Sequence, residues 1–187
     1  LEGEDSSLYV MTPPLRSKKD KLILQDALVA KEIQVVATDH CTFTKEQKNS
    51  SKDCRTIFPG VPGREELLPL IHTFAVASGR MSLSHMVRLL STAPAKAFGL
   101  YPQKGSLEVG SDADIVIFDS EHLWTLSAEN LHSAAGYTPY EGFNVVGKAI
   151  MTYLRGRLVV GDGIYLSKKG GGKFIEAQES LVFEGFR

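Results

Sequence analysis

The hydrophobic pattern at the start of the chain predicts alternating strands and helices. The run 34–38 is nearly all apolar and contains two valines, which is typical of a parallel strand buried on both faces. A shorter apolar run at 9–11 ends at two prolines. Residues 17–32 between the two runs have helical spacing, with Asp20 as the expected N-cap. We therefore expect a right-handed βαβ unit in the first 40 residues.

Further helices are predicted before the pattern changes. Apolar spacing predicts a helix over residues 65–78 that ends at Gly79, and another that begins after Ser82. Pro94 is expected in the first turn of a short helix that follows. Residues 42–58 are mostly polar, so we expect a long exposed loop there.

Strand patterns replace helical ones after residue 99. Short apolar runs separated by turn signals, such as Arg155-Gly156, predict a small antiparallel β unit, with strands at 106–109, 114–118, 149–154 and 157–160. The lysine- and glycine-rich stretch 168–173 and the residues after it are expected to be flexible. The fold class predicted from these patterns is α/β plus β.

Charge and composition exclude several function classes. The 187 residues carry a formal net charge of -1, so no overall field attracts nucleic acid or a membrane surface. No apolar run is long enough for a transmembrane helix. The two cysteines make no disulfide framework, which favours a reducing, cytoplasmic setting. The first residues carry no signal region and no initiator Met, so we expect either a start inside a longer protein or processing.

Asp39 is the main candidate for chemistry. It follows the predicted strand 34–38 directly, and functional groups of β/α barrels lie at the carboxyl ends of the strands. A carboxylate there can bind a cation and exchange a proton. It can equally cap the next turn, and the residues alone leave both interpretations open.

Other chemically versatile side chains have structural interpretations. A lone histidine beside a strand end, such as His40, is expected to be a structural hydrogen-bond partner. The other four form no HxH or HExxH motif and are expected on the surface or in the core; they are His72, His85, His122 and His132. Cys41 is expected to be a small buried thiol rather than a nucleophile.

Several segments taken together resemble the dihydropyrimidinase and hydantoinase family of cyclic amidohydrolases. The matching strings are YVMTPPLR (9–16), VVATDHCTF (35–43), PGVPG (59–63), LSTAPAKAFGLYPQKGSLEVGSDADIVIFD (90–119) and YTPYEG (137–142), ahead of a return strand at 156–163. The resemblance implies the last strands and helices of a (β/α)8 TIM-like barrel, followed by a small antiparallel β-sandwich unit. We accordingly assign 1–99 to the barrel, 100–165 to the outer β unit and 166–187 to a flexible tail.

The resemblance also implies a site and a reaction. Family members hold two divalent metal ions, usually zinc, and open a cyclic ureide or imide to an N-carbamoyl amino acid. Asp39 matches the family's metal-binding aspartate, which also carries the proton, and the backbone at Thr12 and Pro59 matches positions that contact the substrate. The family usually has Asn at position 59. Because Pro59 has no N–H, only its carbonyl remains for such a contact, and Arg64 begins a charged stretch whose order also departs from the family.

Most of the family's metal ligands have no counterpart in this sequence. It contains no HxH pair, no candidate carboxylated lysine in its family context and neither further ligand histidine, and it matches only the last two-fifths of a family member. We expect the chain alone to be inactive and to lack a complete metal site. The alternative is a non-catalytic scaffold or interaction protein, since the family includes such paralogues. Residues 100–187 could also support assembly, because family members are commonly homotetramers.

Overall fold

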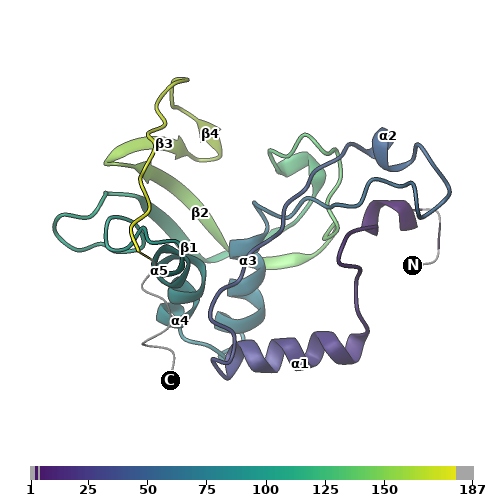
Figure 1. Cartoon of the computed structure of the whole chain (residues 1–187), viewed down its shortest axis with the longest axis horizontal. Coiled ribbons are helices and arrows are strands. Elements are labelled where there is room, and N and C mark those ends of the chain that lie inside the picture. The colour runs from purple at the N-terminus through teal and green to yellow at the C-terminus, as the bar shows by residue number, and fades with distance from the viewer. Residues whose placement is uncertain (1–2, 4, 180–187) are drawn as a thin grey trace.

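The computed structural model describes residue 3 and residues 5–179. Helices occupy the chain up to residue 97, and a sheet follows from residue 115 (Figure 1). The elements in chain order are η1 (Ser6–Tyr9), α1 (Lys18–Val29), α2 (Lys45–Lys48), α3 (Leu67–Ile71), η2 (His72–Val76), α4 (Leu83–Val87), η3 (Arg88–Thr92), α5 (Ala93–Ala97), β1 (Ile115–Thr125), η4 (Ala128–Asn130), β2 (Asn144–Leu154), β3 (Arg157–Gly161) and β4 (Ile164–Tyr165). Within this described part, no helix is long and apolar enough to cross a membrane.

Helix α1 begins one turn earlier than the sequence pattern predicts. Ser17 is the N-cap, and its side chain accepts a hydrogen bond from the Asp20 amide at 3.2 Å. The Asp20 carboxylate accepts in return from the Ser17 amide at 3.1 Å, which completes a capping box. The prediction of Asp20 as the cap is therefore wrong, because the carboxylate acts from the first turn of the helix. Only Leu28 of this helix is buried, whereas Leu24 is exposed.

The two predicted helical regions before residue 99 are confirmed. α3 continues directly into the π-helical turn η2, and Gly79 follows with a φ of 75°. Ser82 caps α4 by accepting from the His85 amide, and α4, η3 and α5 follow without a break. Pro94 lies in the first turn of α5, as predicted. These helices form the main core with α1, through Leu28, Ala75, Met81, Met86 and Leu89.

Three predicted strands are wrong. Tyr9 is the last residue of the short 3-10 helix η1, and neither residues 10–11 nor residues 34–38 form a strand, so the described residues contain no βαβ unit. A strand exists only where a neighbouring strand completes its hydrogen-bond ladder, and the described residues place none beside 34–38. Residues 106–109 form no strand and Val109 is fully exposed, and the expected loop 42–58 contains α2.

The predicted antiparallel β unit is confirmed as a four-stranded sheet in the order β1-β2-β3-β4. β1 pairs with β2 from Ile115 opposite Tyr153 to Thr125 opposite Asn144. The turn between β2 and β3 has positive φ at both central residues, 49° at Arg155 and 75° at Gly156. This conformation matches the twist of paired strands, which is why hairpins favour it. The second layer of a sandwich stays a prediction, since the described strands form one sheet.

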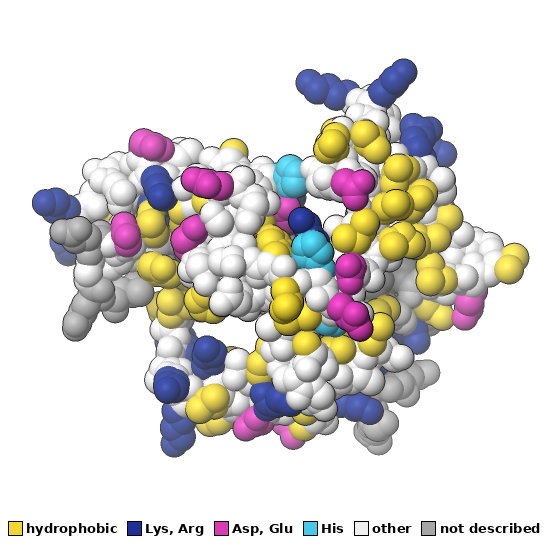
Figure 2. All heavy atoms as spheres, turned by 180° about the vertical axis from the view of Figure 1, so that it is seen from behind, with side chains coloured by type: hydrophobic (Ala, Val, Ile, Leu, Met, Phe, Trp, Pro, Cys, Tyr) yellow, Lys and Arg dark blue, Asp and Glu magenta, His cyan; other side chains and the backbone are white. Residues whose placement is uncertain are grey.

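The sheet leaves apolar side chains exposed. Figure 2 shows hydrophobic side chains gathered over the strands on the rear face of the molecule. Large exposed apolar residues on the strands are Val116, Ile117, Leu123, Ile164 and Tyr165. These exposed apolar side chains lie on β1 and β4, and no described residue covers them.

The helices are joined to the sheet at β2. His72 Nδ1 lies 2.7 Å from the Val146 carbonyl oxygen, and the Val146 amide donates to Thr73 Oγ1 at 2.8 Å. Gly147 follows with a φ of 102°, and a Cβ there would lie 2.8 Å from Nδ1 of His72 in η2. Only glycine lets the strand approach the helix this closely.

Residues 166–179 contain no helix or strand but contact the helical part. The Gln178 amide donates to the Gly99 carbonyl at 2.9 Å, and a Cβ at Gly99 would lie 2.0 Å from the Gln178 carbonyl oxygen. The predicted flexibility of this tail stays a prediction, and its last residues, 180–187, lie outside the described part.

Candidate functional site

The Asp39 carboxylate is exposed on a loop and is not used as a helix cap. Its backbone has a φ of 48°, a left-handed conformation that aspartate tolerates better than most residues. The helix that follows, α2, is capped by Thr44, whose side chain accepts from the Gln47 amide at 3.3 Å. Within residues 3 and 5–179, the carboxylate makes no hydrogen bond or ion pair. The capping interpretation of Asp39 is therefore wrong, and its oxygens remain available to a ligand.

His40 is a structural hydrogen-bond partner, as expected. Its Nδ1 accepts from the amides of Gly63 at 3.2 Å and Arg64 at 3.3 Å. Because Nδ1 accepts two hydrogen bonds, we assign the ring proton to Nε2, which lies 2.5 Å from Thr42 Oγ1. Nδ1 therefore holds the end of the loop 60–63 beside Asp39, whereas Nε2 contacts Thr42 in the same segment as His40.

The loop that contains Pro59 packs directly against the Asp39 segment. The Cys41 amide donates to the Val61 carbonyl at 3.2 Å. A Cβ at Gly60 would lie 2.4 Å from the Cys41 carbonyl oxygen, so this contact requires glycine. The Cys41 side chain itself is exposed, and the prediction of a buried thiol is wrong because this tight contact is made by the Cys41 backbone.

The segment that contains Thr12 is the third part of the candidate site, after the Asp39 segment and the Pro59 loop. The Gly60 amide donates to the Val10 carbonyl at 3.0 Å, which joins the Pro59 loop to the residues just before Thr12. Thr12 and Pro59 are both exposed. The structure thus brings together the three segments that the resemblance implies, through backbone hydrogen bonds at Gly60 and Val61.

The sequence analysis missed Lys48, which is the centre of this arrangement. Its side chain is fully buried, and its ammonium donates to the carbonyls of Val10 at 2.6 Å, Phe58 at 2.8 Å and Gly60 at 2.9 Å. Burial lowers the pKa of the Lys48 ammonium from its usual value, and the nearby Cys41 thiol acts in the opposite direction. The expectation of an exposed loop over residues 42–58 is wrong at this residue.

One sequence signal could have revealed the helix that carries Lys48. Thr44 and Gln47 form a capping box, in which the Thr44 amide donates to Gln47 Oε1 at 2.8 Å. The spacing Thr-x-x-Gln is a recognised mark of a helix start. It predicts a turn of helix at 45–48, although it does not predict which side chain is buried.

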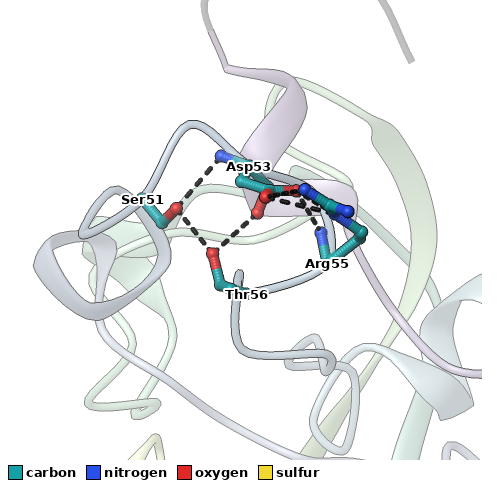
Figure 3. A network of polar contacts seen from close by, with 4 residues as sticks. All are labelled: Ser51, Asp53, Arg55 and Thr56. Atoms are coloured by element: carbon teal, nitrogen blue, oxygen red, sulfur yellow. Dashed lines mark hydrogen bonds and ion pairs between the residues drawn. The ribbon is translucent and has the colours of Figure 1, made fainter.

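A polar network shapes the chain before Pro59. Arg55 Nη2 donates to the Asp53 carboxylate at 2.7 Å, and this ion pair lowers the pKa of Asp53 (Figure 3). Ser51 Oγ lies 2.7 Å from Thr56 Oγ1 and accepts from the Asp53 amide at 3.0 Å. Ile57, directly after this network, is buried. The network folds the loop back so that the Phe58 carbonyl reaches the Lys48 ammonium.

The described residues do not form a metal site by themselves. No group of three or more His, Cys, Asp or Glu side chains within residues 3 and 5–179 could hold an ion. His72 and His85 are buried, and their ring nitrogens lie within hydrogen-bonding distance of backbone carbonyls. His132 pairs with Glu65. Asp39 therefore remains a candidate for one ligand, and the described residues provide no complete set of ligands around it.

Comparison with known sequences gives a consistent result. The sequence profile of the amidohydrolase family matches residues 10–159. The chain is 40% identical over 177 residues to a D-hydantoinase of Ralstonia pickettii and 39% identical over 176 residues to a D-phenylhydantoinase of Escherichia coli O1:K1. These matches cover 94% and 93% of this chain but 38% of each relative. The chain thus spans about two fifths of the length of these relatives.

Solved structures agree with the sequence matches. A D-hydantoinase (dihydropyrimidinase) from Thermus sp. superposes with a TM-score of 0.89 at 36% identity, covering 96% of this chain and 39% of that one. An L-hydantoinase (dihydropyrimidinase) from Arthrobacter aurescens gives a TM-score of 0.81 at 35% identity, covering 88% and 38%. The resemblance identified from the sequence is confirmed, and it implies a TIM-barrel-type fold.

Proposed function

This chain belongs to the amidohydrolase family, and on that premise we propose that it forms the C-terminal portion of an enzyme that hydrolyses a cyclic amide. The substrate class is a dihydropyrimidine, a hydantoin or a related cyclic ureide, and the product is an N-carbamoyl amino acid. The observation that carries the proposal is the 40% identity to a D-hydantoinase over 94% of the chain. The finer assignments rest on the three joined loops around Asp39.

Asp39 has the central chemical role in this proposal. In the hydrolysis, water adds its oxygen to the ring carbonyl carbon, the ring C–N bond breaks, and the ring nitrogen gains a proton. The exposed Asp39 carboxylate accepts the proton released by the attacking water and delivers it to the departing nitrogen. A carboxylate without a partner among the described residues suits that exchange, because no ion pair needs to break first.

Thr12 and Pro59 are the proposed substrate contacts. Both are exposed, and their segments are joined by the hydrogen bond from Gly60 to Val10. Pro59 can offer only a carbonyl, so it would accept a hydrogen bond from a ring N–H of the substrate. Cyclic ureides and imides carry such N–H groups, which fits the substrate class.

The proposed enzyme depends on two divalent metal ions, with zinc as the expected metal, and Asp39 as one ligand. Such ions polarise a carbonyl and make water more acidic near neutral pH. The described part of this chain lacks the further ligands, so the complete site would need residues from outside it. We therefore propose that the chain alone is inactive, and we derive no step through the metals.

The test compares the isolated chain with the protein made from the complete reading frame that encodes it. Zinc content per chain and the release of N-carbamoyl product from hydantoin and dihydrouracil would be measured for both. We expect two zinc ions and turnover for the protein from the complete reading frame, and neither for the isolated chain. Zinc-loaded protein without turnover on either substrate would contradict the enzymatic proposal and support the scaffold alternative. Turnover by the isolated chain would contradict our view that its site is incomplete.

A further inference from the structure

The Lys48 ammonium is used completely by three backbone carbonyls. An ammonium has three N–H donors, and each of these faces one acceptor, the carbonyl of Val10, Phe58 or Gly60. The three distances lie between 2.6 and 2.9 Å, within the range of charge-assisted hydrogen bonds. The side chain therefore joins two segments that are far apart in sequence and are both implicated in substrate contact.

The surroundings of Lys48 indicate a positioning role. Its side chain is 0% exposed, and no acidic side chain within residues 3 and 5–179 forms an ion pair with it. Burying a charge without a counter-ion is unfavourable unless its hydrogen bonds are satisfied. For Lys48 the cost of burial is offset by hydrogen bonds to three backbone carbonyls. The ammonium therefore fixes the backbone positions of these residues.

The carbonyls that bind the Lys48 ammonium include those of both neighbours of Pro59. Phe58 and Gly60, on either side of it, both direct their carbonyls at the Lys48 nitrogen. Pro59, between them, is exposed, and its carbonyl is not among the three acceptors of the Lys48 ammonium. That carbonyl is therefore left for a substrate contact. Proline adds rigidity, because its φ is fixed by the ring.

We propose that Lys48 is a positioning residue that fixes the substrate loop, residues 58–63, against the Thr12 segment. This role rests on the proposed function, since the loop would hold the cyclic substrate through the Pro59 carbonyl. Lys48 itself touches neither substrate nor reacting atoms. It acts through the carbonyls that it holds, so its loss should weaken substrate binding more than the chemical step.

The first measurement follows the loop itself in the isolated chain. Amide hydrogen exchange is read at Gly60, which donates to Val10, and at Cys41, which donates to Val61. Lys48→Met keeps the apolar stem and removes the donors. We expect exchange at Gly60 and Cys41 to accelerate by roughly tenfold or more, as local opening becomes easier. Lys45→Met, on the exposed side of the same short helix, is the matched control and should leave both rates unchanged.

The second measurement uses the protein from the complete reading frame with hydantoin as the substrate. Lys48→Met should raise KM by roughly tenfold or more, with kcat changed by less than about threefold. Should Lys48→Met fail to fold, Lys48→Arg keeps the charge, but its planar fork cannot direct donors at three carbonyls around one nitrogen. Lys48→Arg should therefore also raise KM, while Lys45→Met should not.

The outcomes separate the two proposals. Absence of turnover in the wild-type protein would overturn the proposed function and this role with it. Wild-type turnover combined with unchanged KM in the Lys48 variants would overturn the positioning role alone. A fall in kcat at constant KM would also contradict it, as would unchanged exchange at Gly60 and Cys41 in Lys48→Met.

Discussion

Nδ1 of His132 lies 2.7 Å from Oε1 of Glu65. Nε2 of the same ring lies 2.7 Å from the Gly163 carbonyl oxygen, so both ring nitrogens face acceptors. A neutral imidazole has one N–H and can satisfy only one of them. The hydrogen bond with Glu65, followed by that with Gly163, raises the pKa of the His132 ring above its usual value of 6.5. When protonated, the ring joins the turn before α3, at Glu65, to the turn between β3 and β4, at Gly163.

Stability from this contact should decline as the pH rises. Because the folded pKa lies above the unfolded value of 6.5, the contribution is fully present below pH 6.5 and is lost as the pH passes the folded pKa. His132→Gln should therefore cost more stability at about pH 6 than at about pH 9. The effect should stay under about 1 kcal/mol, since the pair is largely exposed and screened by solvent. Urea unfolding of both proteins at each pH measures it.

A double-mutant cycle with Glu65→Gln isolates the pair from other effects of the substitution. The coupling free energy between the two positions should be detectable at about pH 6 and should vanish at about pH 9. A coupling that is constant over this pH interval would show that charge on His132 is not the cause.

Gly147 should be the glycine least tolerant of a side chain at the junction between the helices and the sheet. A Cβ there would lie 2.4 Å from Phe118 Cζ and 2.8 Å from His72 Nδ1. Gly110 is the matched control, because its φ of 100° is close to the 102° of Gly147 and nothing lies within 4 Å of its Cβ position. Gly110→Ala should cost about 1–2 kcal/mol from backbone strain alone. Gly147→Ala should cost about 1–3 kcal/mol more, from overpacking.

Thermal and urea unfolding of the two alanine variants test this difference. Equal destabilisation would mean that the strand moves away from His72 at little cost. In that case the close approach at Gly147 would not be a strong constraint on the junction.

The cap of α4 gives a smaller and more local prediction. Ser82 Oγ accepts from the His85 amide at 3.2 Å, so Ser82→Ala removes a partner of an amide at the helix start. The expected loss is about 1 kcal/mol in the free energy of unfolding. Ser84→Ala, at an exposed position within the same helix, should be neutral or slightly stabilising. Destabilisation by Ser84→Ala equal to that of Ser82→Ala would contradict the cap assignment.

Local chemistry explains which parts of the fold could be predicted from the sequence. The start of α4 at Ser82 and the turn at Arg155 and Gly156 depend on residues close in sequence, and both are confirmed. The strand at 34–38 depends on neighbours that its own residues do not specify, and it does not form among the described residues. The exposed Leu24 of α1 illustrates the same limit, because helical spacing predicts an apolar face but not whether anything covers it.

Some residues of the candidate site could likewise be identified from the sequence, and others only from the structure. Asp39, Thr12 and Pro59 could be proposed from short strings because they match a family pattern. Lys48 could not, since it stands among polar residues, and its burial arises from carbonyls 38 and 12 residues away in the chain. His40 is intermediate. Its structural role was expected, whereas its partners, the amides of Gly63 and Arg64, became evident only in three dimensions.

Substitutions at Asp39 test the proposed proton transfer most directly. Asparagine tolerates the left-handed conformation at φ 48°, so Asp39→Asn should preserve the loop, whereas Asp39→Ala adds backbone strain. In the protein from the complete reading frame, Asp39→Asn should keep most of its bound metal but lose turnover by at least about a hundredfold, because an amide cannot carry the proton. Asp39→Ala should lose metal as well. Metal analysis and product release separate the two effects, and near-normal turnover in Asp39→Asn would exclude Asp39 as the proton carrier.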